Sequence, residues 1–433
     1  MSFNINVSRL LNRKGIEIFL FWIILATTSF FGFYVLVPGA DQFYTVDFSM
    51  ICLLFFSLVY VVAVDIKKTS ILYVHGTYTV ILFLLVILSL IEFIMSRIRY
   101  GQPLMASFKD FIYYTATFIV YMAFIIDRND RVSVKTLADY LVKFSIATSI
   151  ISLFLYYAYT YLHKNIINLN DTDSGNFRNG TIRFTIGATV IVLGMIISMT
   201  RAIQRQVSRI DIVNIILGVI NLLLVSKTRT IIAYIFVIIC INAAFGKRTN
   251  GVVRFLSVLG LIFSVIYLIS QGVTLITTSV NDLVNSDIGV RHRIYTIDFY
   301  WKQFVGSPWW GMGFISGDKA YPNWDLASGD GKRGTFYRDD VGIIGTLNEF
   351  GMIGAIWMIA FFITIWYKVT RYSVQDNDPY LIYREIIKNI LIYMAISLIN
   401  LSFMDPPRVM MIAFVTLLAD SYIYEVKVTH AKK

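Results

Sequence analysis

Uninterrupted apolar runs of about 20 residues dominate the sequence, and this is the length a helix needs to cross the hydrocarbon core of a membrane. Hydrophobic residues make up 57% of the 433 residues and charged residues only 15%, whereas about a quarter of a typical soluble domain is charged. Backbone groups in lipid must be paired within the protein, so each run is predicted to be a helix. No stretch between the runs is long and polar enough to form a separate soluble domain.

The runs predict an all-α fold, a polytopic transmembrane helix bundle with about twelve spans. Residues 1–433 are expected to form a single membrane domain. The predicted spans centre on 16–38, 46–64, 71–95, 108–126, 137–161, 182–200, 210–226, 230–245, 252–270, 341–367, 387–404 and 408–425.

The basic residues between the runs indicate how the chain is oriented. With the N-terminus inside, the cytoplasmic segments hold about 21 Lys and Arg residues and the outer loops hold about 16. About seven of the outer residues lie in one long loop, and long loops have little influence on membrane orientation. The first run, 16–38, follows Arg9, Arg13 and Lys14, exceeds the length of a signal-peptide core and lacks an obvious cleavage site. It is therefore predicted to be an uncleaved span, with both termini in the cytoplasm.

One long extracytoplasmic loop, 271–340, is predicted before the tenth span. Loops of this length are uncommon and are often functional. Within it, apolar residues recur at helical spacing over 286–305, with charged residues between them, which predicts an amphipathic helix on the membrane face. The Gly/Pro/Trp-rich stretch 306–313 that follows predicts a turn.

Several classes of function are disfavoured. The chain has no P-loop, no dinucleotide-binding glycine motif and no His or Cys residues at metal-ligand spacing, so no cofactor and no metal is predicted. Cys52 and Cys240 lie in apolar runs and are expected to be packing residues. The net charge of +11 suits anionic lipid headgroups and phosphate-bearing ligands. Nucleic acid is a poor partner because the basic residues sit in short loops.

Two basic clusters are candidate phosphate-binding sites. Lys227 and Arg229 lie in a very short predicted outer hairpin, 226–229, and Arg291 and Arg293 flank His292 on the predicted amphipathic helix. Arg is a planar, two-pronged donor suited to phosphate groups. The alternative is that these side chains extend to lipid headgroups or solvent at helix ends. Arg97 and Arg99, in another outer loop, are treated as controls outside the site.

The acidic candidates lie where the long loop enters the tenth span. Arg338, Asp339 and Asp340 precede the span, and Glu349 lies inside it. A carboxylate within a membrane helix is unfavourable unless it faces the bundle interior or a partner, which makes Glu349 a site candidate. The alternatives are a structural pair of Glu349 with an Arg such as Arg183, and a helix-capping role for Asp340. Aromatic residues of the loop form either an interfacial belt or sugar-stacking surfaces.

These segments resemble the O-antigen polymerase and O-antigen ligase superfamily over roughly a third of the chain. The resemblance rests on the Ser-x-Thr-Arg hairpin at 226–229, on Pro308, Gly311 and Gly313 of a Pro-x-x-Gly-x-Gly turn, and on Glu-x-Gly-x-x-Gly at 349–354. Where the ligases have His and Asn, this chain has Asp340 and Val341. That departure favours a repeat-unit polymerase of the capsular or exopolysaccharide type.

The resemblance implies glycosyl transfer from an undecaprenyl-pyrophosphate-linked chain, at the outer face of a bacterial cell membrane. It implies Asp340 as the base, Asp339 as its neighbouring alternative and Glu349 as a positioning group. The cations that would bind pyrophosphate are Arg229, Lys227, Arg291, Arg293 and Arg338. The expected partners are lipid-linked oligosaccharides, membrane lipids, and flippase and chain-length regulator proteins.

Three other functions stay open at this stage. A ligase would transfer the finished glycan to a different acceptor. A lipid-linked oligosaccharide flippase, or another transporter, predicts broken spans in matched positions of two halves, with charges near the midplane. A scaffold in an export complex would not need the intramembrane Glu349.

Overall fold

The computed structural model describes part of the chain. The described residues are 51, 54–59, 76–125, 132–164, 177–178, 181–182, 187–245, 251, 254–263, 288–317, 319, 321–329, 336–372, 378–405 and 408–431. The predicted spans at 16–38 and, for the most part, 46–64 lie outside these residues, as do 264–287 of the predicted ninth span and long loop.

The regular structure of the described residues is helical apart from one short ribbon, so the predicted all-α class is confirmed. The ribbon pairs β1 (Phe177–Arg178) with β2 (Thr181–Ile182) in antiparallel register, Phe177 opposite Ile182. The helical elements are α4 (Thr79–Tyr100), α5 (Leu104–Ile125), α6 (Val134–Leu162), α7 (Ala188–Ile203), α8 (Arg209–Ile220), the π-helical turn η3 (Asn221–Val225), α9 (Arg229–Phe245), α12 (Ile288–Gly306), α13 (Trp324–Ser328), the 3₁₀ turn η4 (Arg338–Asp340), α14 (Ile343–Arg371), α15 (Leu381–Ser397) and α16 (Met410–Ala431).

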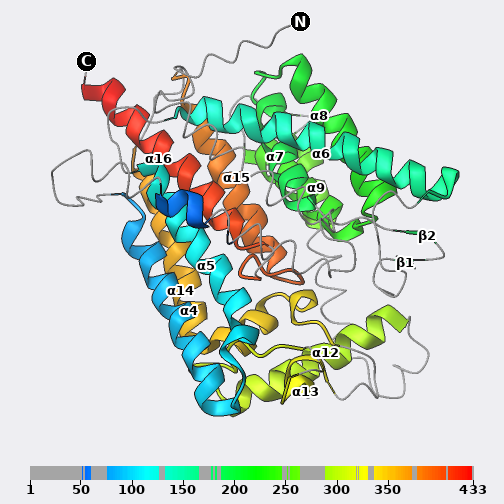
Figure 1. Ribbon diagram of the computed structural model, residues 1–433. Coiled ribbons are helices and arrows are strands. Elements are labelled where there is room, and N and C mark those ends of the chain that lie inside the picture. Colours follow the sequence, from blue (N-terminus) through cyan, green and yellow to red (C-terminus); the bar gives the residue numbers. More distant parts are fainter. Residues whose placement is uncertain are drawn as a thin grey trace, which may run out of the picture.

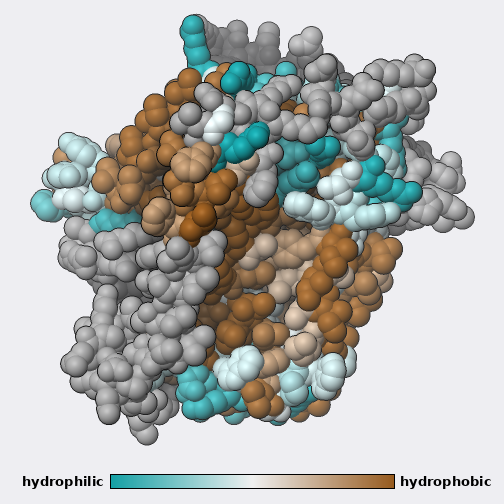
Figure 2. Space-filling model, turned by 180° about the vertical axis from the view of Figure 1, so that it is seen from behind, coloured by the Kyte–Doolittle hydropathy of each residue, from teal (hydrophilic) through white to brown (hydrophobic). Residues whose placement is uncertain are grey.

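Three of these helices, α4, α6 and α14, are long and apolar enough to cross a membrane. Shorter apolar helices accompany them, and Figure 2 shows a broad hydrophobic area over the middle of one face, with hydrophilic residues above it and along its lower margin. These features support membrane insertion. The number of spans stays a prediction.

The predicted span 387–404 differs from the structure, because α15 runs from Leu381 to Ser397 and residues 398–405 leave the helix. The Asp405-Pro-Pro sequence disfavours a helix where this segment ends, since a residue before proline avoids the α conformation. The backbone carbonyl of Leu398 instead accepts a hydrogen bond from Ile343 N at 2.8 Å. The start of α14 is therefore attached to the chain that follows α15.

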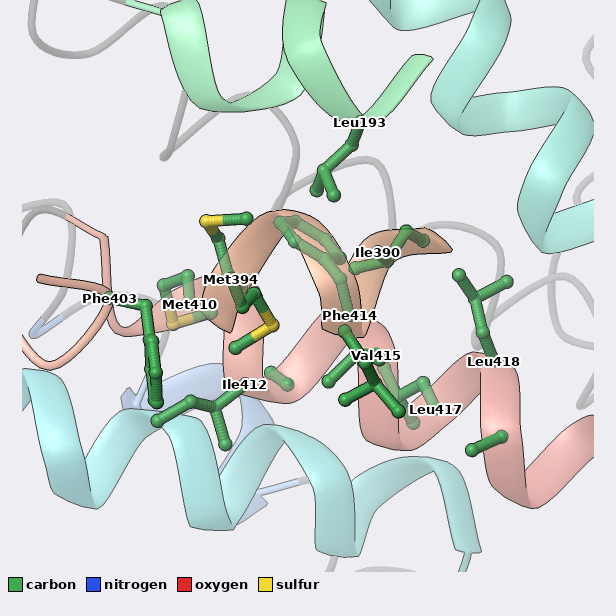
Figure 3. Packing of buried hydrophobic residues seen from close by; sticks show 14 of the residues in the cluster. Leu193, Ile390, Met394, Phe403, Met410, Ile412, Phe414, Val415, Leu417 and Leu418 are labelled. Carbon is green, nitrogen blue, oxygen red and sulfur yellow. The ribbon is translucent and has the colours of Figure 1, made fainter. Parts of the chain in front are cut away.

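Helix α16 passes through the middle of the core. Its residues 410–423 are all buried and mostly apolar, as expected for a helix surrounded by other helices, and its last turns are partly exposed. Figure 3 shows Met410, Ile412 and Phe414 of α16 packed among side chains of α15, α7 and the 398–405 segment. In Figure 1, α4, α5 and α14 lie on one side of this core, and α6 to α9 lie on the other.

At one end of the bundle, α4 ends at Tyr100, α14 begins, and α12 and α13 lie across the helices (Figure 1). We call this the α12 end. At the other end, buried Arg201 of α7 pairs with Asp139 of α6 at 2.7 Å and with Asp211 of α8 at 3.2 Å. Asp211 also completes a capping box with Ser208 at the start of α8. This network holds α6, α7 and α8 together away from the α12 end.

Candidate functional site

Helix α14 is broken at Gly351, whose backbone has φ 61° and ψ −160°. In a continuous helix the amides of Met352 and Ile353 would donate to the carbonyls of residues 348 and 349. Here Met352 N donates to the carbonyl of Pro308 at 2.8 Å, and Ile353 N donates to that of Trp309 at 3.3 Å. The break therefore opens α14 to the turn predicted at 306–313.

The carbonyls that the break leaves open are used by the same turn. Met312 N donates to Asn348 O at 2.6 Å, and Gly313 N donates to Glu349 O at 3.0 Å. A Cβ on Gly351 would lie 2.3 Å from Trp309 O, so a side chain at this position would collide with the turn. Hydrogen bonds to the turn thus replace the helical hydrogen bonds that α14 loses at the break. Only glycine at position 351 leaves room for the turn to approach this closely.

The turn is also fastened to α4 and α5. Arg99 Nη1 donates to Ser307 Oγ and to Gly311 O, both at 3.0 Å. Ser107 Oγ and Gln102 Nε2 both donate to the carbonyl of Phe314, at 2.7 and 3.0 Å. The expectation that Arg99 lies outside the site is therefore wrong, because the turn folds back onto the end of α4. Arg97 instead donates to the carbonyls of residues 101 and 102.

Glu349 is buried in the first part of α14 and pairs with Arg338 of η4, whose Nη2 lies 3.5 Å from Glu349 Oε1. Arg338 Nη1 also donates to Gly313 O at 3.1 Å. The sequence left open a structural partner such as Arg183, which lies outside the described residues, and the structure supplies Arg338 instead. One guanidinium therefore joins η4, α14 and the turn.

Glu92 of α4 is a second buried carboxyl group at this site, and the sequence reasoning missed it. It is fully buried, and its Oε2 lies 3.3 Å from where a Cβ on Gly313 would be. It interacts electrostatically with Glu349. The signal was present, since the rule that singled out Glu349 as a carboxylate inside an apolar helix applies equally to Glu92.

Tyr234 of α9 hydrogen bonds to the segment that holds the start of α14 and lies within electrostatic range of α12. Arg293 of α12 is exposed and interacts electrostatically with Tyr234 of α9. The Tyr234 hydroxyl donates to Asn400 Oδ1 at 2.5 Å. Asn400 N lies 2.8 Å from where a Cβ on Gly342 would be, and Gly342 has a left-handed φ of 53°. The geometry therefore joins α9 to the entry of α14, and Arg293 of α12 acts on this region electrostatically.

The other predicted site residues are placed as follows. Asp340 is exposed at the end of η4, and α14 is preceded by Gly342 rather than capped by Asp340, so the capping alternative is not supported. Lys227 follows η3, its ammonium lies over the ring of Tyr156 at 5.6 Å, and partial burial lowers its pKa. Nothing is described for the side chains of Arg229, Arg291 and Asp339.

Within the described residues, no three His, Cys, Asp or Glu side chains are close enough together to hold a metal ion. No protein-family model matches the chain. No curated protein matches it closely enough to show a relationship.

The Arg338–Glu349 pair provides a stability test. Replacing Arg338 by Gln leaves Glu349 buried without its cation, so we expect the free energy of unfolding to fall by about 3 kcal/mol. The double variant Arg338→Gln/Glu349→Gln should lose less than the sum of the single variants, with a coupling of about 1–3 kcal/mol. Chemical unfolding of the purified protein measures these values.

The exposed Lys302–Asp298 pair of α12 is the control, for which coupling below about 1 kcal/mol is expected. Equal coupling in the two pairs would contradict a buried role for Arg338.

Proposed function

We propose that the protein is a membrane glycosyltransferase that polymerises undecaprenyl-pyrophosphate-linked oligosaccharide repeat units at the outer face of a bacterial cell membrane. The observation that carries the proposal is the insertion of the Pro308–Gly313 turn into α14 at Gly351. Two of the three motifs that carry the family resemblance, the 308–313 turn and the 349–354 segment, are far apart in sequence, yet they bond to one another. Their spacing is thus tied to a common structure, which supports the resemblance beyond a chance match of short motifs.

The proposed reaction is a single displacement. The acceptor hydroxyl loses its proton to the Asp340 carboxylate while its oxygen bonds to the anomeric carbon of the donor. The bond from that carbon to the pyrophosphate oxygen breaks, and undecaprenyl pyrophosphate leaves with the electron pair. Inversion at the anomeric carbon is expected. A donor that carries its own leaving group needs no nucleotide, which fits the absence of nucleotide-binding motifs in the sequence.

Fixed cations would stabilise the departing pyrophosphate. We assign this role to Arg229, Lys227, Arg291 and Arg293. The electrostatic interaction of Arg293 with Tyr234 and the hydrogen bond from Tyr234 to Asn400 support a common location for α12, α9 and the entry to α14. Arg338 holds Glu349 and Gly313, so its part in the reaction is to position the loop rather than to contact the phosphates directly.

A flippase is the second candidate, favoured by the broken helix α14 with a buried carboxylate beside the break. Transporters use such breaks because the ends of the half-helices bind the substrate. In this chain the amides of Met352 and Ile353 and the carbonyls of Asn348 and Glu349 bond to the turn. The backbone groups that the break exposes are therefore used to bind the turn and are not open to a transported substrate. Glycosyl transfer is the better-supported proposal.

Purified protein in liposomes with synthetic undecaprenyl-pyrophosphate-linked repeat units tests the activity. We expect products of two or more repeat units with release of undecaprenyl pyrophosphate. Movement of the lipid-linked unit between leaflets without any growth in chain length would support the flippase instead.

The proposed topology has about twelve spans, both termini in the cytoplasm and the α12 end outside. We expect a single cysteine at exposed Lys319 to react with a membrane-impermeant reagent in intact cells, and one at exposed Val428 in α16 to react only after lysis. Ser328 of α13 is buried and does not suit such labelling. Protection of Lys319→Cys in intact cells would overturn the position of the loop and the proposed chemistry.

Arg291→Lys should lower polymer formation much more than a charge count suggests, because Lys keeps the charge but loses the planar pair of donors. Each good charged hydrogen bond contributes about 1.5–3 kcal/mol, which corresponds to a loss of roughly tenfold to a hundredfold in rate. Arg209→Lys, at an exposed position at the start of α8, is the control. Equal and small losses in both variants would make Arg291 an ordinary surface charge.

A further inference from the structure

Glu92 occupies an unusual position for a carboxyl group. It lies in α4 about two turns before the helix ends at Tyr100, and it has no exposed surface. Neither of its carboxyl oxygens has a hydrogen-bond partner in the part of the chain that is described. The proposed glycosyl transfer gives it no role.

Charged and titratable groups surround Glu92 from several elements. Arg99 and Tyr100 belong to its own helix, Glu349 of α14 interacts with it electrostatically, and the turn meets it at Gly313. Arg338 of η4 pairs with Glu349, and Tyr114 of α5 interacts electrostatically with Glu349, Arg338, Asp110 and Asp405.

The two nearby arginines, Arg338 and Arg99, form their hydrogen bonds and ion pairs with groups other than Glu92. Arg338 lies 3.5 Å from Glu349 and bonds to Gly313 O, and Arg99 donates to Ser307 and Gly311 without forming a hydrogen bond to Glu92. An ionised carboxylate that is buried without hydrogen bonds is strongly unfavourable. Two neighbouring carboxyl groups cannot both ionise readily, and such pairs characteristically share one proton. A proton on Glu92 removes both the buried charge without hydrogen bonds and the repulsion between the two carboxylates.

We propose that Glu92 and Glu349 form a proton-binding site, in which one proton is held on Glu92 at neutral pH while Glu349 stays ionised against Arg338. The pair, one proton and the Arg338 guanidinium together carry no net charge, which suits a buried position. The site places a neutral acid against the turn, where loss of its proton would put a second negative charge beside Gly313. This inference concerns the resting protein and does not depend on the proposed glycosyl transfer.

Infrared spectroscopy of the purified protein during a pH titration tests the site, since it separates carboxylic acid from carboxylate without requiring reagent access. We expect an acid band at neutral pH that disappears in Glu92→Gln. In Glu349→Gln the repelling charge is gone, so the band should be lost at a pH lower by at least about one unit. Asp298→Asn, which removes an exposed carboxylate of α12, should leave the band unchanged. A neutral-pH band identical in wild type and Glu92→Gln, or an unchanged midpoint in Glu349→Gln, would overturn the proposal.

Thermal unfolding gives a second readout. A Glu in the unfolded chain ionises near its ordinary pKa of about 4.3, so a folded state that keeps the proton loses stability as pH rises above that value. Glu92→Gln cannot ionise and escapes this loss. We expect its Tm to match wild type in mild acid and to exceed it by a margin that grows toward alkaline pH. A Tm that falls below wild type at alkaline pH would show that Glu92 is needed as a carboxylate.

Discussion

Asp340→Asn is expected to lower polymer formation by about 10²–10⁴-fold, with protein level and binding of the lipid-linked substrate retained. This is the size of effect that a positioned acid–base group contributes to a rate. Asn keeps the shape of the side chain and removes its ability to accept the acceptor's proton. The exposed position of Asp340 at the end of η4, beside the attachment of α14 to the 398–400 segment, leaves its carboxylate accessible to a hydroxyl group.

Two comparisons separate this role from a structural one. Asp339→Asn should have a smaller effect, because the proposal assigns the base to Asp340 alone. Asp298→Asn, at an exposed position on α12, should have none. Helix capping is not available as an explanation, since Gly342 occupies that position. Near-normal polymerisation by Asp340→Asn, measured with purified protein in liposomes, would remove Asp340 from the mechanism.

Gly351→Ala should abolish most activity. The backbone of Gly351 lies in a region that is essentially restricted to glycine, and adopting it with a side chain costs about 1–3 kcal/mol. Any Cβ would also lie 2.3 Å from Trp309 O. We expect the helix to close across residues 348–353 and expel the turn. Displacement of the groups around the site by about 1 Å is enough for a hundredfold loss in rate, so polymerisation should fall by at least about that factor.

Gly306→Ala is the matched control, because no atom lies within 4 Å of a Cβ at the end of α12 and the backbone there is ordinary. It should retain polymerisation and stability. Polymerisation rate and limited proteolysis of the loop report the two parts of the prediction. Full activity of Gly351→Ala with an intact, protected turn would mean that the bonds between the turn and α14 do not organise the site.

Local physics made much of the fold predictable. Apolar runs require helices in lipid, and the described residues are helical in most of the predicted spans. The spacing over 286–305 predicted a helix that the structure has as α12, and the Gly/Pro composition predicted the turn after it. In each case one segment carries its own signal, either a period or a turn residue.

Contacts between distant segments were not predictable in the same way. The break at Gly351 depends on four hydrogen bonds to residues 308–313, and no local pattern specifies them. Arg99 looked remote because its loop is remote in sequence, although the fold brings it onto Gly311. The pairing of Glu349 with Arg338 was open among several arginines, and only the three-dimensional arrangement selects one.

The lipid-linked glycan profile of a strain that lacks this protein tests the proposed function most directly. If the protein is the polymerase, single repeat units should accumulate on lipid at the outer face of the membrane, and expression of the wild-type chain should restore long chains. Repeat units trapped at the inner face would contradict the proposal in favour of a flippase. Full-length chains that are never transferred to an acceptor would contradict it in favour of a ligase.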